Sequence, residues 1–279
     1  MKSLNDRIQD FYDASTQLWL DTWGEHMHHG YYGEEGREKK DHRQAQVDLL
    51  MALLKWGGVE QANRILDAGC GVGGSARLLA SLYDARVLGV TLSPVQAERA
   101  RQYNREAGLE EQVRIEARDM MALRFEEGPF DLIWSMESAE HIEDKKRLLE
   151  LFYELLEPGG RFLMATWCHR DTPPRLSEEE VHLLDKLYRL YHLPPMISIA
   201  RFETLARQAG FEQVKVNDWS DAVAPFWQAV IRSAFSWAGL SGLLKSDWST
   251  LKGAWAMRYM TQGYRQGTIK FGVIQGQKP

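Results

Sequence analysis

The fold of this 279-residue chain is decided by the stretch Ile65-Leu66-Asp67-Ala68-Gly69-Cys70-Gly71-Val72-Gly73-Gly74. It opens with apolar residues typical of a buried strand. Its alternating glycines let the backbone come close to a ligand where a Cβ atom would collide. A helical pattern begins at Gly74, so we expect a strand, a tight turn and a helix whose first amide groups face the ligand. The simpler alternative is a glycine turn that binds nothing.

Outward from this motif, short apolar runs alternate with helical patterns, which is typical of a doubly wound α/β fold with a mostly parallel, Rossmann-like sheet. Ser93 and Pro94 read as the N-cap and first residue of a helix. Helices are expected at 74–82, 94–107, 144–156 and 202–208. Seven strands are expected at 64–68, 86–91, 112–116, 130–135, 161–167, 213–218 and 268–276.

Three helical segments fall outside this alternation. Residues 1–56 are expected to form a helical cap, and residues 170–200 and 219–266 to form lid insertions. No stretch has the composition of a flexible linker, so we expect one domain spanning residues 1–279.

The composition excludes several classes of function. The chain has 34 Lys and Arg against 39 Asp and Glu, without a basic block, which argues against a nucleic-acid partner. No apolar run approaches the roughly 20 residues that span a bilayer. The N-terminus lacks the pattern of a signal or transit peptide, and the two cysteines do not form a disulfide framework. These features predict a cytoplasmic or other intracellular protein.

Asp67 decides between a nucleotide and a methionine-derived cofactor. An acid at the end of the first strand, before the glycines, resembles motif I of class I methyltransferases, where it orients S-adenosylmethionine. A dinucleotide enzyme more often has a neutral residue here, because its phosphates repel a carboxylate. Such an enzyme should also carry an acid where Thr91 stands. We therefore expect S-adenosylmethionine as cofactor and S-adenosylhomocysteine as product, with an NAD-dependent oxidoreductase as the distant alternative.

The same resemblance implies further cofactor contacts at the ends of the following strands. Thr91 and Gln96 are expected at the ribose hydroxyls and Asp119 at the adenine amino group. The complete predicted cofactor set is Tyr12, Asp67, Gly69, Cys70, Gly71, Gly73, Thr91, Leu92, Gln96, Asp119, Met120, Ser135 and Met136.

Nine segments outside the glycine loop closely resemble γ-tocopherol C-methyltransferases. They are FYDAS (11–15), LW (18–19), WGEHMHHGYY (23–32), TLSPVQ (91–96), WSMESAEH (134–141), ATWCHR (165–170), DWS (218–220), VAPFW (223–227) and FG (271–272). The resemblance spans nearly the whole chain and implies a cyanobacterial or plastid-type enzyme that methylates a ring carbon of a prenylated chromanol. N- or O-methylation of an aromatic alkaloid or phenol, and sterol C-methylation, are the alternatives.

A small aromatic acceptor of this kind asks for a base and an apolar pocket. A phenolic carbon becomes nucleophilic when the ring hydroxyl loses its proton, and His141 is our candidate base. Glu137 and Glu140 are expected to orient His141 or to share its role. The alternative for His141 is a helix-cap or surface histidine. Pocket walls are expected from Trp23, His26, His29, Tyr31, Trp167, Trp219, Phe226 and Trp227.

Two further possibilities concern metal and membrane. His26, His28 and His29 resemble a ligand cluster, but no further residue completes a zinc spacing, so we expect no metal. The amphipathic segment 221–244 suggests a peripheral membrane contact, against which its lack of a strongly basic face argues.

Overall fold

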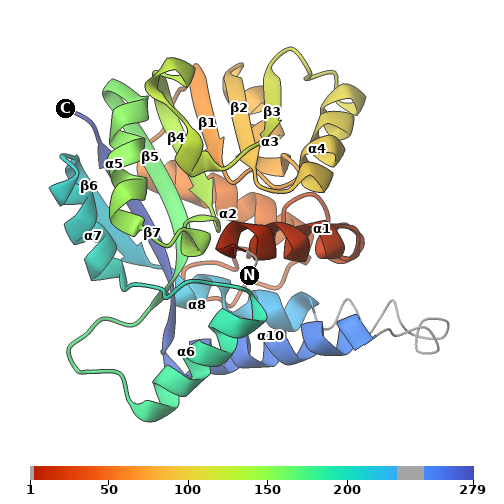
Figure 1. Cartoon of the computed structure of the whole chain (residues 1–279), viewed down its shortest axis with the longest axis vertical. Coiled ribbons are helices and arrows are strands. Elements are labelled where there is room, and N and C mark those ends of the chain that lie inside the picture. The colour runs from red at the N-terminus through yellow and green to blue at the C-terminus, as the bar shows by residue number, and fades with distance from the viewer. Residues whose placement is uncertain (1–2, 231–247) are drawn as a thin grey trace.

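The computed structural model describes residues 3–230 and 248–279, and it contains a seven-stranded sheet in the order β3-β2-β1-β4-β5-β7-β6 (Figure 1). Neighbouring strands run parallel, except that β7 is antiparallel to both β5 and β6. This arrangement confirms the predicted doubly wound, mostly parallel sheet. The strands are β1 Arg64–Ala68, β2 Arg86–Thr91, β3 Val113–Ala117, β4 Phe130–Met136, β5 Leu156–His169, β6 Glu212–Asp218 and β7 Ile269–Gln277.

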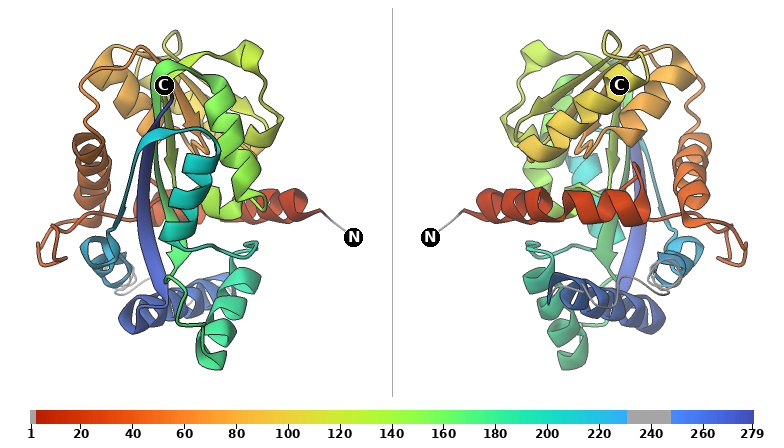
Figure 2. Two further views of the ribbon diagram at one scale, coloured as in Figure 1. Left: turned by 90° about the vertical axis from the view of Figure 1, so that its left-hand side faces the viewer. Right: turned by 90° about the vertical axis from the view of Figure 1, so that its right-hand side faces the viewer.

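Helices cover both faces of the sheet (Figure 2). One apolar cluster joins Ile65 of β1 to α2, α3 and α4, whereas Leu66, the next residue, belongs to a second cluster with α5 and α7. Successive side chains of a strand point to opposite faces, and a parallel strand is buried on both. The helices are α1 Leu4–Trp23, α2 His42–Gly57, α3 Gly74–Tyr83, α4 Pro94–Glu106, α5 Lys145–Leu155, α6 Glu178–Leu190, α7 Ile199–Gln208, α8 Ser220–Val223 and α10 Trp248–Gln266.

The helical segments outside the alternation gather mainly at the carboxyl ends of the parallel strands. Figures 1 and 2 show α1, α6, α8 and α10 at this end of the sheet. The helix α2 differs from the expected cap, because its Leu49 and Leu53 are fully buried in the cluster on the face of the sheet. Part of the predicted insertion, residues 231–247, lies outside the described residues.

Most boundaries of the predicted strands and helices lie within two residues of the prediction, but two elements begin earlier than expected, each for a local reason. The strand β5 begins at Leu156, which pairs with Phe130, and pairing resumes between Arg161 and Leu132, so the Pro-Gly-Gly turn is a bulge within the strand. The helix α7 begins three residues earlier than expected, because the Ser198 side chain accepts a hydrogen bond from the amide of Arg201 and caps it.

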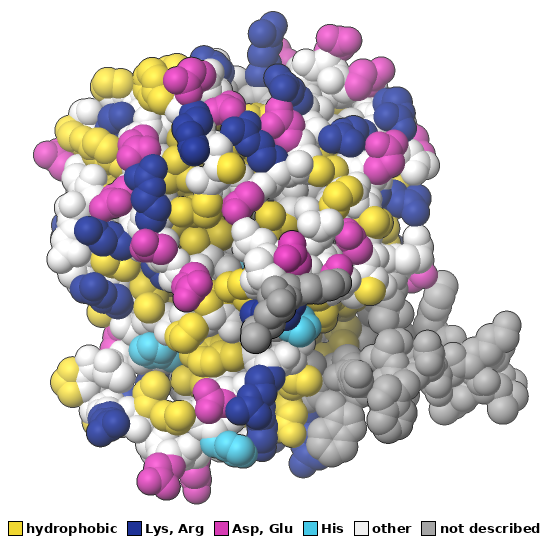
Figure 3. Space-filling model, in the orientation of Figure 1, with side chains coloured by type: hydrophobic (Ala, Val, Ile, Leu, Met, Phe, Trp, Pro, Cys, Tyr) yellow, Lys and Arg dark blue, Asp and Glu magenta, His cyan; other side chains and the backbone are white. Residues whose placement is uncertain are grey.

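Among the described residues, no helix combines the length and apolar character that crossing a membrane requires. On the face seen in Figure 3, acidic and basic side chains are interspersed over the surface. Cys70 and Cys168 are buried free thiols, and β4 separates their strands in the sheet.

Candidate active site

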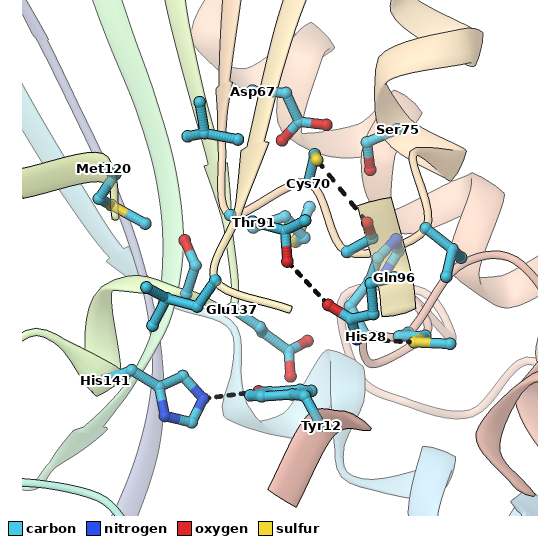
Figure 4. A pocket seen from close by; sticks show the side chains of 18 of the residues that line it. Tyr12, His28, Asp67, Cys70, Ser75, Thr91, Gln96, Met120, Glu137 and His141 are labelled. Carbon is cyan, nitrogen blue, oxygen red and sulfur yellow. Dashed lines mark hydrogen bonds between the residues drawn. The ribbon is translucent and has the colours of Figure 1, made fainter. Parts of the chain in front are cut away.

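A cavity of about 870 Å³, counted with its open mouth, lies at the carboxyl ends of β1, β2 and β4, with α1 contributing to its wall. Figure 4 shows Asp67 and Ser75 toward one end and the Tyr12–His141 pair toward the other. The structure brings most of the predicted cofactor residues to this cavity: Tyr12, Asp67, Gly69, Cys70, Gly71, Thr91, Leu92, Gln96, Asp119, Met120 and Met136 line it.

Asp67, the next-to-last residue of β1, carries a buried carboxyl group and is 1% exposed. Burial raises its pKa to about 7, and the Ala76 amide and the Arg77 charge only partly oppose that effect. Its Oδ2 atom has no hydrogen-bond partner among the described residues. A buried carboxylate oxygen without a partner is unfavourable, and a ligand cation beside it would offset this cost. This end of the cavity therefore fits the ammonium group of S-adenosylmethionine.

The glycine loop gives the cavity its floor. Gly69 has φ +96°, and a Cβ atom there would overlap the side chain of Ser138. Two predicted residues stand behind the floor and do not line the cavity. Gly73, with φ +78°, is the N-cap of α3, and the Ser135 hydroxyl lies 2.9 Å from that of Ser138. Gly73 and Ser135 therefore support the glycine loop on the side that faces away from the cavity.

The groups expected at the ribose and adenine are hydrogen-bonded within the protein. Thr91 Oγ1 donates to Gln96 Oε1 at 2.9 Å. Asp119 accepts hydrogen bonds from the Met121 amide at 2.9 Å and from Asn5 Nδ2 at 2.7 Å. Hydroxyl and carboxylate oxygens each carry two lone pairs, so these side chains remain able to accept from a ligand.

A second, more enclosed cavity of about 450 Å³ adjoins the first and has an aromatic wall. It matches the apolar acceptor pocket expected from the sequence in its general character. Its lining residues are Phe11, Tyr12, Trp19, Trp23, Met27, His29, Glu137, Glu140, His141, Trp167, Tyr191, Phe226 and Trp227.

Three predicted pocket residues lie elsewhere. His26 lines the first cavity instead of the second. Tyr31 and Trp219 line neither, and their rings pack against each other with centroids 5.4 Å apart. Tyr31 lies away from the cavities because its backbone amide donates a hydrogen bond to the Ala45 carbonyl at 2.7 Å. This bond holds the Tyr31 part of the loop against α2.

Four residues line both cavities: Tyr12, Met27, Glu137 and His141. They mark the junction between the cavity that holds the buried Asp67 carboxyl group and the cavity with the aromatic wall. A group that passes from one cavity to the other must pass among these side chains.

His141 lies in the short helix η3 (Ala139–His141) that follows β4. Its Nε2 atom is 2.7 Å from the Tyr12 hydroxyl, and its buried Nδ1 has no partner within the part of the chain that the structure describes. Burial, assisted by the charge of Lys145, lowers the pKa of His141 to about 3. Burial also raises the pKa of Tyr12 well above its usual range. Both side chains are therefore neutral at physiological pH.

Glu137 connects the two sides of the junction through hydrogen bonds to His29 and Trp167. Its carboxylate accepts hydrogen bonds from the His29 amide at 2.6 Å and Trp167 Nε1 at 2.8 Å, and it lies 2.8 Å from His29 Nδ1. Burial alone would raise the pKa of Glu137, but the His29 contacts bring it below its usual value. Its φ of +48° is unfavourable for a residue other than glycine, by about 1–2 kcal/mol. These contacts make Glu137 a positioning residue for the loop and the aromatic wall.

Glu140 is a second buried carboxyl group, after Asp67, whose protonation changes near neutral pH. Burial, with the nearby charge of Glu137, raises its pKa to about 8. The Thr166 hydroxyl donates to its Oε2 at 2.7 Å, and Lys145 Nζ donates to its carbonyl oxygen at 3.1 Å. Glu140 thus has the pKa of a general base and lines the acceptor cavity.

Several functional contacts were not predicted from the sequence. Gln46, fully buried on α2, donates to the carbonyls of His26 and His28. It thereby holds the loop between α1 and α2, residues 24–41, which we call the histidine loop. Phe11 and Trp19 join the acceptor wall from α1. Phe11 and Trp19 are eight residues apart, so they lie on the same face of α1, together with Tyr12 and Ser15. The helical periodicity of the sequence could therefore have predicted that Phe11 and Trp19 lie near Tyr12.

Comparison with known proteins places this geometry in context. Residues 65–160 match the family described as Methyltransferase domain. The chain is 41% identical over 285 residues to the probable tocopherol O-methyltransferase, chloroplastic, of Oryza sativa subsp. japonica, which covers 99% of this chain and 79% of that protein. It is 39% identical over 290 residues to the tocopherol O-methyltransferase, chloroplastic, of Arabidopsis thaliana, covering 100% and 83%. The 2-methyl-6-phytyl-1,4-hydroquinone methyltransferase of Synechocystis is 31% identical over 290 residues, covering 97% and 87%.

Solved structures agree in fold. The cyclopropane synthase MmaA2 from Mycobacterium tuberculosis superposes with a TM-score of 0.85 at 19% identity, covering 98% of both chains. The geranyl diphosphate C-methyltransferase from Streptomyces coelicolor A3(2), in complex with Mg2+, geranyl diphosphate and S-adenosyl-L-homocysteine, has a TM-score of 0.78 at 20% identity, covering 100% of this chain and 98% of that one. At these identities the likeness shows the fold alone.

Proposed function

This chain belongs to the tocopherol O-methyltransferase family of S-adenosylmethionine-dependent methyltransferases, and on that basis we propose that it methylates a ring carbon of a tocopherol-type prenylated phenol. The family relationship confirms the cofactor and the enzyme class predicted from Asp67 and the glycine loop. The observation that carries the acceptor proposal is the junction itself. A cavity with an unpartnered carboxyl oxygen, Asp67 Oδ2, meets an aromatic cavity at Tyr12 and His141.

Asp67 and the glycine loop would hold the cofactor. S-adenosylmethionine supplies an electrophilic methyl group on a sulfonium ion. In this proposal Asp67 takes the ammonium group, and Thr91 and Gln96 accept from or donate to the ribose hydroxyls. The strand order also argues against the oxidoreductase alternative, because β7 is inserted antiparallel between β5 and β6, unlike a dinucleotide-binding sheet.

The acceptor cavity activates the phenol by removing its hydroxyl proton. His141 Nδ1 is the unpartnered atom that we assign to the phenol hydroxyl, with Tyr12 orienting the ring through Nε2. Because the pKa of His141 is only about 3, a group of higher pKa must take the proton away, and Glu140, with a pKa of about 8, suits that role. After the carbon–carbon bond forms, the ring carbon loses its hydrogen as a proton and the oxygen is protonated again. One proton is released in all.

The aromatic walls complete the mechanism by excluding water. Trp23, Trp167, Phe226 and Trp227 surround the acceptor cavity, and each is at most 8% exposed. Glu137 fixes the Trp167 indole by a hydrogen bond of 2.8 Å. Much of the rate enhancement in such a displacement comes from holding the reacting atoms in line, for which a rigid wall is suited.

The test is the identity of the product. We expect the purified protein to transfer a 13C-labelled methyl group from S-adenosylmethionine to γ-tocopherol, and carbon NMR to place it on the aromatic ring. A methyl ether as product would refute ring-carbon transfer. Absence of any product from γ-tocopherol and a panel of simpler phenols would refute the acceptor class.

Location and membrane contact belong to the same proposal. The rice and Arabidopsis relatives are chloroplastic, and the Synechocystis relative is cyanobacterial, so we infer that this chain acts in a plastid or a cyanobacterial cell. The amphipathic segment predicted at 221–244 falls largely on residues outside the described structure. A peripheral membrane contact therefore stays a prediction, to be measured by flotation of the protein with lipid vesicles.

A further inference from the structure

Several polar groups of the acceptor cavity are hydrogen-bonded within the protein. Trp167 Nε1 donates to Glu137, His29 Nδ1 contacts the same carboxylate, and Glu140 accepts from Thr166. Among the described residues that line this cavity, the buried polar atoms without a partner are His141 Nδ1 and Trp227 Nε1. The mechanism above uses the first of them. It has no role for the second.

The indole N–H of Trp227 has no hydrogen-bond partner within residues 3–230 and 248–279. The residue is 1% exposed, and its ring packs at centroid distances of 5.8 Å from Trp23, 5.7 Å from Phe226 and 5.1 Å from His29. An indole N–H donates and never accepts. A buried donor left unpaired destabilises a protein, so it is usually matched by water or a ligand. A ligand atom that satisfies it must be an acceptor, such as an ether, hydroxyl or carbonyl oxygen.

We propose that Trp227 Nε1 recognises a second oxygen of the acceptor, the one para to the hydroxyl that faces His141. This inference rests on the proposed function and makes it more specific. In a chromanol the para oxygen is the ring ether, which accepts a hydrogen bond and cannot donate one. It therefore complements an indole N–H. His141 Nδ1 and Trp227 Nε1 would then each bind one oxygen of the acceptor. Together they would select rings that carry two oxygens para to each other over rings with a single hydroxyl group.

The experiment compares two acceptors that differ at one atom. One is a short-chain 6-hydroxychroman with the methyl substitution of γ-tocopherol, and the other has CH2 in place of its ring oxygen. The methylated carbon lies meta to that oxygen, so the replacement changes its intrinsic reactivity little. We expect the wild-type protein to favour the chroman by about 10-fold or more in kcat/KM, as a site with an unpaired buried donor should.

Trp227→Phe removes the N–H and keeps an aromatic wall. We expect it to lower kcat/KM for the chroman by about 10-fold and to reduce the preference between the two acceptors to about 2-fold or less. Trp23→Phe is the matched control, because Trp23 lines the same cavity and its indole nitrogen is not among the buried atoms that lack a partner. It should affect both acceptors by the same factor and leave their ratio unchanged.

The outcomes separate this inference from the proposed function. Equal kcat/KM for the two acceptors in the wild-type protein overturns the inference without any variant, even if Trp227→Phe does not fold. An unchanged preference in a folded Trp227→Phe, verified by its thermal shift with S-adenosylhomocysteine, also overturns it. Failure of γ-tocopherol and both test acceptors to be methylated at all would instead overturn the proposed function.

Discussion

Replacing Asp67 by Asn should stabilise the protein and weaken its ligand binding, two effects of opposite sign from one carboxyl group. The pKa of Asp67 is raised from 3.8 to about 7 by burial. Because the folded-state pKa lies above the unfolded one, ionisation favours the unfolded chain, and stability falls as the pH rises from about 4 to 7. A difference of about 3 units corresponds to about 4 kcal/mol at 1.36 kcal/mol per unit. Asparagine has no such penalty.

The free energy of unfolding without ligand should therefore increase in Asp67→Asn by up to about 4 kcal/mol at pH 8, and by about half as much at pH 5. Urea denaturation followed by tryptophan fluorescence measures both values. Asp185→Asn is the matched control, because this carboxylate on α6 is exposed and its replacement should change the free energy little at either pH.

Ligand binding should show the opposite effect. An ammonium group beside Asp67 requires the ionised carboxylate, whose fraction falls from about nine-tenths at pH 8 to about one-tenth at pH 6 for a pKa of about 7. The affinity of the wild-type protein for S-adenosylhomocysteine should fall by about tenfold over this range, relative to the variant. Loss of a buried charge pair should weaken binding by the variant by about 30- to 1000-fold at pH 8.

Calorimetric titration of both proteins at pH 6, 7 and 8 makes the comparison, and the ligand's own amine titration cancels in the ratio. The reasoning fails if Asp67→Asn is less stable than wild type without ligand. It also fails if the ratio of the two affinities is flat between pH 6 and 8, or if the variant binds as tightly as wild type.

Four further predictions follow from the junction. His141→Ala should bind S-adenosylhomocysteine within about 3-fold of wild type and lose about 10²- to 10⁴-fold in kcat, so unchanged turnover would remove this side chain from the mechanism. Glu137→Gln should lower the free energy of unfolding by about 2–4 kcal/mol in urea, because its amide hydrogens would face donors; an unchanged midpoint would contradict its positioning role. In wild type, kcat should rise with pH around 8 as Glu140 ionises, and Thr166→Val should move this rise to higher pH, since a hydrogen bond that lowers the pKa is lost. Gln46→Leu should weaken S-adenosylhomocysteine binding by about 10-fold in calorimetry by releasing two loop carbonyls, and an unaltered affinity would show that the loop needs no such support.

The fold could be predicted because its signals are local. The glycines predict the β1–α3 turn, because Gly69, Gly71 and Gly73 all have a positive φ that other residues rarely adopt. The apolar runs fixed β1 and β2 to the residue, and the Ser93 cap placed the start of α4. The bulge in β5 was missed because it depends on pairing with β4, a neighbour in space and not in sequence.

The candidate site was predicted best where backbone position alone places a residue. Residues at the carboxyl ends of β1, β2 and β4 line the cofactor cavity for that reason. The sequence was a poorer guide to the histidine loop and the inserted helices. From the sequence, His26, Tyr31 and Trp219 were expected in the wall of the acceptor cavity. In the structure His26 lines the cofactor cavity, and Tyr31 and Trp219 pack against each other outside both cavities.

By itself, then, the amino-acid sequence determined the α/β sheet, the glycine loop with its acid, and membership of a methyltransferase family. Only the tertiary structure decided which side chains meet at the junction. Tyr12 contacts His141 across 129 residues of chain, and His29 contacts Glu137 across 108. The physical reason is that backbone geometry depends on a few neighbouring residues, whereas the direction of a buried side chain and its pKa depend on every segment packed around it.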